Sequence, residues 1–163
     1  MYLLIWILAV GVGATLVMDA WVLALKHALG ISSLNYALVG RWAGHILRGR
    51  FAHAHIGQAE PITGETALGW AVHYATGVCF ATFLAILGGI DWMTTPTPGL
   101  ALAVGLGTVA APFLIMQPAF GFGVAASKLP ARRTARLKSV VTHLVFGFGL
   151  YLSAIAVSHL TGP

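Results

Sequence analysis

Long stretches with almost no charged side chain are the feature that most constrains this chain. Residues 66–90 and 99–117 contain no Asp, Glu, Lys or Arg, and residues 2–25 and 137–160 contain one each. A helix needs roughly 20 mostly apolar residues to cross the hydrocarbon core of a bilayer. These stretches therefore predict four spanning helices, at about residues 2–25, 66–90, 99–117 and 137–160.

Composition supports the same class. Hydrophobic residues make up 58% of the chain and charged residues 8%, whereas a soluble domain carries about 25% charged residues. Disorder is excluded by the apolar content, and a disulfide scaffold by the single cysteine, Cys79. The first stretch lacks a basic leader and is too long for a signal sequence, so we expect a retained helix. We expect one all-α domain over residues 1–163, a polytopic transmembrane four-helix bundle in a lipid bilayer.

The distribution of positive charge predicts an orientation. All nine Lys and Arg lie in residues 26–65, in residues 118–136 or in the first turn of the fourth helix. The positive-inside rule makes both loops cytoplasmic and both termini periplasmic, in a bacterial inner membrane. We expect anionic lipid headgroups as partners of these loops and no nucleic acid, because no aromatic residues are interleaved with the basic ones. Four short helices would form a thin wall, so transport would require a homo-oligomer.

The first loop is too long to be a plain connector. Its apolar side chains recur at near-helical spacing: Leu34, Leu38, Trp42 and Ile46. Candidate N-caps precede them: Ser32, Ser33 and Asn35. Arg41 and His45 fall on a different face, which predicts an amphipathic helix in the headgroup region with Arg41 and Trp42 at its boundary.

Polar residues inside the expected spans fall at a common depth. Asp19, His73 and His143 each lie six or seven residues from the cytoplasmic end of a helix, which is about 9–10 Å inside the boundary. Gln117 is somewhat shallower. Small residues share their helix faces: Gly11 and Thr15 with Asp19, Gly69 and Gly77 with His73, Ser139 and Gly147 with His143. Such faces mark close helix approach, so we expect these polar side chains to point inward. Pro112 is expected to disturb the third helix before Gln117.

Several chemistries are compatible with this group. Asp19, His73 and His143 are the ligand types of a divalent transition metal such as Zn or Fe. The same groups suit a proton relay, or a structural network that ties the helices together. A haem or quinone between the histidines has less room. The sequence leaves these alternatives open.

The first loop contributes further candidates. His45, His53 and His55 could add ligands from the loop, although paired loop histidines are also common on surfaces. Glu65 is placed either as a favourable charge at a helix N-terminus or as a ligand. Arg41 could bind an anion or anchor the helix at the membrane interface.

Several segments together resemble a bacterial membrane protein family, domain-of-unknown-function family 2938. They are MDAW at residues 18–21, NYALVGRWAGH at 35–45, GRF at 49–51, GETALGWAVHY at 64–74, MQPAFGFGVAAS at 116–127 and HLVFGFGLYLSA at 143–154. The resemblance implies a small polytopic inner-membrane protein and carries no activity with it.

No nucleotide-binding loop, GxSxG, HExxH or CxxC motif is present, so the sequence does not decide whether the protein is an enzyme. The leading hypothesis is an intramembrane Asp/His/His/Gln site that binds a metal ion or a small polar ligand. The alternatives are a proton-coupled transporter component and a structural subunit without a ligand.

Overall fold

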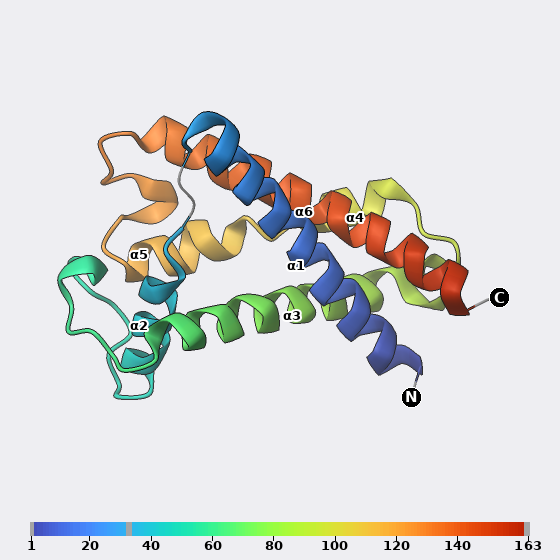
Figure 1. The fold of residues 1–163 in the computed structure, drawn as a ribbon, viewed down its shortest axis with the longest axis horizontal. Helices are drawn as coiled ribbons and strands as arrows, with labels where there is room; N and C mark the ends of the chain where they lie inside the picture. The colour runs from blue at the N-terminus through green and yellow to red at the C-terminus, as the bar shows by residue number, and fades with distance from the viewer. Residues whose placement is uncertain (1, 32–33, 162–163) are drawn as a thin grey trace. The chain divides into compact units, whose positions relative to one another are not determined.

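The structure, a computed structural model, describes residues 2–31 and 34–161, and most of these residues are helical (Figure 1). The helices are α1 (Tyr2–Leu29), α2 (Tyr36–Ile46), α3 (Glu65–Thr94), α4 (Pro98–Gly107), α5 (Gln117–Ala119) and α6 (Arg132–Thr161). Shorter turns lie between them: 3₁₀ turns at Ile56–Gln58 and Val124–Ala126 and a π-helical turn at Pro112–Met116. The described residues contain no strand. The expected all-α class is therefore confirmed.

Four helical segments are long and apolar enough to cross a membrane: Leu3–Leu29, Glu65–Thr94, Pro98–Ala119 and Arg132–Leu160. They leave large apolar side chains exposed along their lengths, such as Leu16, Ile86 and Leu114. Soluble proteins rarely expose apolar surface on this scale, whereas lipid would cover it. The four apolar helices indicate a membrane protein and correspond to the four expected spans.

The helices extend beyond the uncharged stretches. α1 continues past residue 25 to Leu29, and α6 begins at Arg132 rather than near residue 137. Lys and Arg are good helix formers, so a positive charge ends an apolar stretch without ending the helix. α3 also continues past the uncharged stretch that ends at residue 90, through Asp91 to Thr94. Its helical geometry is interrupted earlier, at Gly89, whose φ of 66° favours glycine.

The third span contains the disturbance expected at Pro112. α4 ends at Gly107, and the π-helical turn begins at Pro112 and runs to Met116. Proline has no N–H to donate to the helix, and a wider turn at this point accommodates that loss. α5 follows directly and carries Gln117.

The chain forms two compact units, and the single domain expected over residues 1–163 stays a prediction. Unit 1 comprises Met1–Ser33, Tyr74–Thr108 and Val141–Pro163, and unit 2 comprises Leu34–His73 and Val109–Val140. Each unit is described by itself.

Unit 1 has an apolar core with very close helix contacts at glycines. Its fully buried side chains include Val10, Leu84 and Leu150. A Cβ added to Gly11 would lie 2.6 Å from the Cα of Val78. Other close approaches join Gly77 to Thr15 and Gly105 to Gly147. The prediction that Gly11, Gly77 and Gly147 mark packing faces is thus confirmed.

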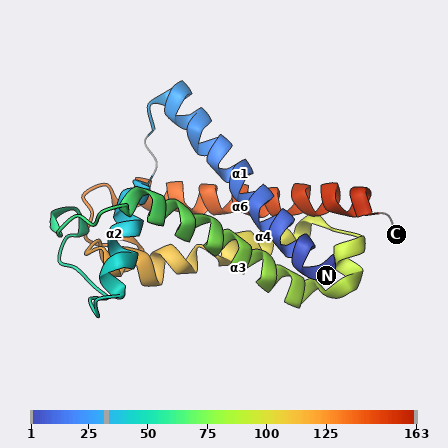
Figure 2. The same ribbon diagram turned by 60° about the horizontal axis from the view of Figure 1, so that its bottom comes forward.

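In unit 2, α2 packs directly against the first turns of α3 (Figure 2). A Cβ on Gly40 would collide with the carbonyl oxygen of Glu65, and one on Gly69 with that of Tyr36. The N-cap of α2 is Asn35, whose side chain accepts a hydrogen bond from the Ala37 N–H at 3.0 Å. Ser32 and Ser33, the other expected caps, lie outside the described residues.

The face that α2 buries differs from the expected one. Its buried residues are Val39, Gly40, Arg41, Gly44 and His45, whereas Leu38, Trp42 and Ile46 are only half-buried. Arg41 is 9% exposed and lies on this buried face, and its expected position at the membrane boundary stays a prediction. The close contact of Gly40 with α3 turns this face inward, and the charge of Arg41 is balanced there by Glu65.

Candidate functional site

An ion pair between α2 and α3 is the first element of a polar network in unit 2. Nε of Arg41 donates to Oε2 of Glu65 at 2.9 Å, and Nη2 donates to Oε1 at 2.8 Å. The two side chains are 11% and 16% exposed. The two parallel hydrogen bonds form a bidentate arginine–carboxylate pair. Glu65 also opens α3, where a negative charge is favourable, as the sequence predicted.

The third nitrogen of Arg41 holds the loop that follows α2. Nη1 donates to the carbonyl oxygens of Ile56, Gly57 and Ala59 at 3.3, 3.4 and 3.0 Å. The hydrogen bond to Glu65 raises the pKa of Arg41 further above its ordinary value, against the opposing effect of burial. Arg41 is therefore a permanent positive charge that organises the loop, and each of its three nitrogens already donates to a protein oxygen.

A buried pair of histidines lies one helical turn further along α2. Nδ1 of His45 and Nε2 of His53 are 2.7 Å apart, and the rings are stacked. His45 is 4% exposed and His53 6%. Because one proton serves this contact, one imidazole donates and the other accepts. The pair therefore connects α2 to the loop through a side-chain hydrogen bond.

Two buried side-chain atoms of unit 2 have no hydrogen-bond partner within the described residues. They are Nδ1 of His53 and Oε1 of Gln117. Their segments run side by side, because the backbone N–H of His53 donates to the carbonyl of Ala119 at 2.8 Å. The Ile56 N–H donates likewise to Phe120, at 3.1 Å.

Electrostatics disfavour the charged form of His53. Burial lowers the pKa of His53, and the charges of Arg50 and His45 lower it further. At neutral pH the atom Nδ1 is thus either an N–H donor or a bare lone pair, depending on the tautomer. In either form it can bind one polar atom.

His55, the other loop histidine, is exposed, and its ring contacts Phe122 edge-on at 6.0 Å. The HAH segment thus places one imidazole in the network and one on the surface. The expectation that loop histidines lie on the surface is confirmed for His55 and is wrong for His53.

Asp19 has a tyrosine partner within unit 1. The hydroxyl of Tyr74 donates to Oδ2 of Asp19 at 3.0 Å. A carboxylate in a spanning helix is costly unless it is paired, and this hydrogen bond reduces that cost.

His143 also lies beside a hydroxyl within unit 1. The Thr108 hydroxyl donates to the carbonyl of Gly105 at 2.6 Å, and its oxygen is 2.7 Å from Nδ1 of His143. Because the hydroxyl proton is directed to Gly105, Nδ1 of His143 is the donor in this contact. The proton of the neutral ring is then on Nδ1, which leaves Nε2 as the basic nitrogen.

His73 belongs to unit 2 and contacts aromatic residues. Its Nε2 is 3.0 Å from the Tyr36 hydroxyl, and its ring is packed against Tyr36 and Trp70. Tyr36, Tyr74 and Thr108 were not anticipated from the sequence. The only available signal was their occurrence in or next to apolar helices, which is common for residues of these types.

Asp19 and His143 thus lie in unit 1, and His73 and Gln117 in unit 2. Over residues 2–31 and 34–161, no three His, Cys, Asp or Glu side chains are grouped so as to hold a metal ion. The predicted site of Asp19, His73, His143 and Gln117 at one depth stays a prediction. The structure does bring together the loop candidates Arg41, His45, His53 and Glu65.

Comparison with known proteins adds a family but no activity. No curated protein and no solved structure matches the chain. A family model described as a protein of unknown function (DUF2938) matches residues 8–157. Because this match covers nearly the whole chain, the protein belongs to that family, as its sequence segments had indicated.

Proposed function

We propose that this protein is a multi-pass inner-membrane protein whose polar network around His53 and Gln117 binds a small polar ligand. The observation that supports this proposal is the pair of buried atoms without partners, Nδ1 of His53 and Oε1 of Gln117. An unpaired buried polar atom costs about 1–3 kcal/mol, and folded proteins rarely retain one. A ligand that pairs with these atoms removes the cost and is bound for that reason.

The chemistry of the two atoms defines the ligand class. An amide oxygen only accepts, so the ligand presents an N–H or O–H group to Gln117. The carboxylate of Glu65 is already neutralised by Arg41, which leaves it unsuited to balance the charge of a metal ion. These features favour a small neutral molecule over the alternative of Zn or Fe.

The basic loops support an orientation for this site. Residues 26–65 and 118–136 carry most of the Lys and Arg, and the positive-inside rule assigns such loops to the cytoplasm. The network would then open to the cytoplasmic side, with both termini periplasmic.

A matched pair of glutamine variants tests the proposal. Gln117→Met removes the unpaired oxygen at similar volume, and exposed Gln58→Met is the control. We expect Gln117→Met to raise the unfolding free energy of the ligand-free protein by about 1 kcal/mol and to abolish stabilisation by ligand. Suitable probes are neutral amides, polyols and ureas, with Zn²⁺ and Fe²⁺ as metal probes and elemental analysis of the purified protein. A Gln117→Met variant that binds every stabilising probe as well as the wild type would refute the proposal.

A second candidate function, a proton-linked carrier, is supported by two contacts in unit 1. Asp19 accepts from Tyr74, and His143 contacts Thr108. Acids and imidazoles next to hydroxyls are the components of intramembrane proton relays. This function requires proton flux into proteoliposomes that is lost in Asp19→Asn and retained in Asp91→Asn, an exposed control. If Asp19 is purely structural, Asp19→Asn lowers thermal stability and the liposomes show no flux with either protein.

A further inference from the structure

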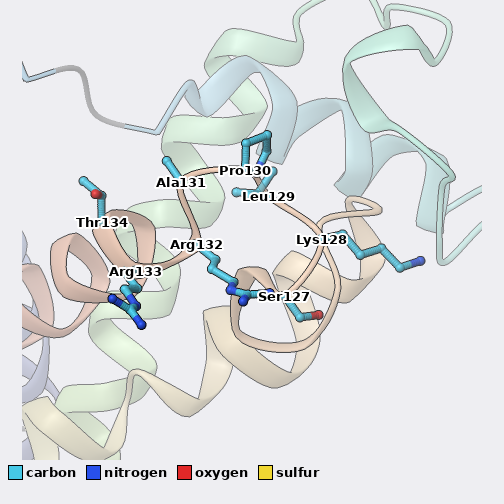
Figure 3. Close-up of a pocket in the computed structure, with 8 residues that line it drawn as sticks. All are labelled: Ser127, Lys128, Leu129, Pro130, Ala131, Arg132, Arg133 and Thr134. Carbon is cyan, nitrogen blue, oxygen red and sulfur yellow. The ribbon is translucent and has the colours of Figure 1, made fainter.

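An open pocket of about 530 Å³ lies outside the polar network, where unit 2 leads into α6 (Figure 3). It is lined by Ser127, Lys128, Leu129, Pro130, Ala131, Arg132, Arg133 and Thr134. Figure 3 shows Arg132 directed across the loop toward Ser127, while Lys128 and Arg133 extend on opposite sides of it. The pocket thus combines a central guanidinium and hydroxyl with two flanking cations.

The positive charges of this pocket have no local counter-charge. Lys128, Arg132 and Arg133 are exposed, and the ion pair found in the described ranges, Arg41 with Glu65, does not involve them. The sequence contains no Asp or Glu after Asp91. None of the residues that line the pocket is acidic, so an external anion can supply the negative charge.

The start of α6 strengthens the attraction for an anion. Helix N-termini carry free N–H groups and a partial positive charge, so acidic residues are favoured there. The first turn of α6 contains no acidic residue and begins instead with Arg132 and Arg133. Like charges accumulate at this point, and a bound anion would relieve their repulsion.

A side-chain contact fixes the wall of the pocket. Nε of Arg136 donates to the carbonyl of Ala125 at 2.7 Å. This bond joins the first turns of α6 to the 3₁₀ turn at Val124–Ala126, which directly precedes the lining residues. The loop is thus held at both ends.

We propose that this pocket binds a phosphate group. Arg and hydroxyl side chains at a helix N-terminus are the groups that recognise phosphate in proteins. The candidate membrane span Arg132–Leu160 begins at the pocket, and such a span would place the pocket at the depth of phospholipid headgroups. The phosphate comes either from the headgroup of an anionic phospholipid or from free phosphate in solution, and the test distinguishes the two.

The test compares two double variants with equal loss of charge. Arg132→Gln/Arg133→Gln changes the pocket, and Arg48→Gln/Arg50→Gln changes exposed cations in the other basic loop. Each full-length protein, purified in a neutral detergent, is titrated with inorganic phosphate and with phosphatidylglycerol or phosphatidylcholine in mixed micelles, and binding is read by native mass spectrometry. Thermal unfolding checks that each variant is folded.

We expect the pocket variant to bind phosphatidylglycerol about 30-fold more weakly, since each basic residue near an anionic surface contributes about 1 kcal/mol. The loop control should change by less than about threefold. Selective binding of phosphatidylglycerol identifies a lipid headgroup, and equal binding of inorganic phosphate identifies free phosphate. Absence of binding by the wild type, equal binding by the pocket variant, or an equal loss in the loop control overturns the proposal.

Discussion

The ion pair of Arg41 and Glu65 makes a quantitative prediction about how unit 2 is held together. Arg41→Met removes two hydrogen bonds to Glu65 and three to loop carbonyls. It also leaves a carboxylate that is 16% exposed with one remaining donor, the Ile62 N–H at 3.0 Å. Breaking a buried pair costs about 3–5 kcal/mol, and the partial exposure of this pair places the expected loss near 3 kcal/mol.

A double-mutant cycle isolates the interaction. Glu65→Met leaves the guanidinium with its three carbonyl partners, so we expect a smaller loss of about 2 kcal/mol. Arg41→Met/Glu65→Met leaves no unpaired charge and should lose about 3 kcal/mol instead of the additive 5, because apolar replacements of both partners are tolerated. The expected coupling is thus about 2 kcal/mol.

Denaturant unfolding in detergent, followed by far-UV circular dichroism, measures these free energies, and proteolysis of residues 47–64 reports on the loop. The matched control is Arg48→Met, an exposed arginine close to the same loop, with an expected change below about 0.5 kcal/mol. Additive single changes, or an Arg41→Met variant as stable as the control, would refute the reasoning.

Three further predictions follow from packing, titration and charge. Gly69→Ala should destabilise the protein by about 2–3 kcal/mol, because its Cβ would meet the carbonyl of Tyr36. The control in the same unfolding assay is Gly99→Ala, which has nothing near its Cβ. Equal stability of the two variants would contradict the α2–α3 contact. The pKa of His53 is lowered in the folded state. Below about pH 6.5 the unfolded state therefore binds more protons than the folded state, and the unfolding free energy decreases as the pH is lowered, by up to about 1.4 kcal/mol per pH unit. Unfolding titrations of His53→Gln should show a shallower loss than those of His55→Gln, and identical pH profiles would contradict this assignment. A cysteine at position 50 or 133, introduced with Cys79 replaced by Ala, should resist an impermeant maleimide added outside cells and react after lysis; labelling from outside would reverse the proposed orientation.

The spanning helices were predictable because their signal is local. An uncharged stretch of sufficient length leaves a chain in lipid few alternatives to a helix, and the four stretches correspond to the four spans. The N-cap Asn35 and the disturbance at Pro112 were also predictable, because each depends on the chemistry of one residue and its neighbours. The helix ends were less predictable, since Arg132 continues a helix as well as an apolar residue does.

The polar network was only partly predictable, because its contacts join residues distant in sequence. Arg41 and Glu65 were each recognised as candidates, but their pairing was not predictable because they are 24 positions apart in the sequence. Apolar periodicity assigned Arg41 to an outer face of α2. The actual face is set by backbone contact at Gly40 and Gly69, and glycines contribute almost nothing to a hydropathy pattern.

The loop after α2 shows why a hydropathy pattern does not predict such a site. Of its large apolar side chains, Ile56 is fully buried, whereas Leu47 and Phe51 are exposed. Polar contacts with Arg41, His45 and the carbonyls of residues 119 and 120 fix the rest of its course. A loop held in this way loses several hydrogen bonds when one partner changes, and each is worth about 1 kcal/mol or more when buried. Protonation of His53 acts on the contacts that define the loop, and the proposed ligand at the Gln117 oxygen would couple binding to the local structure of unit 2.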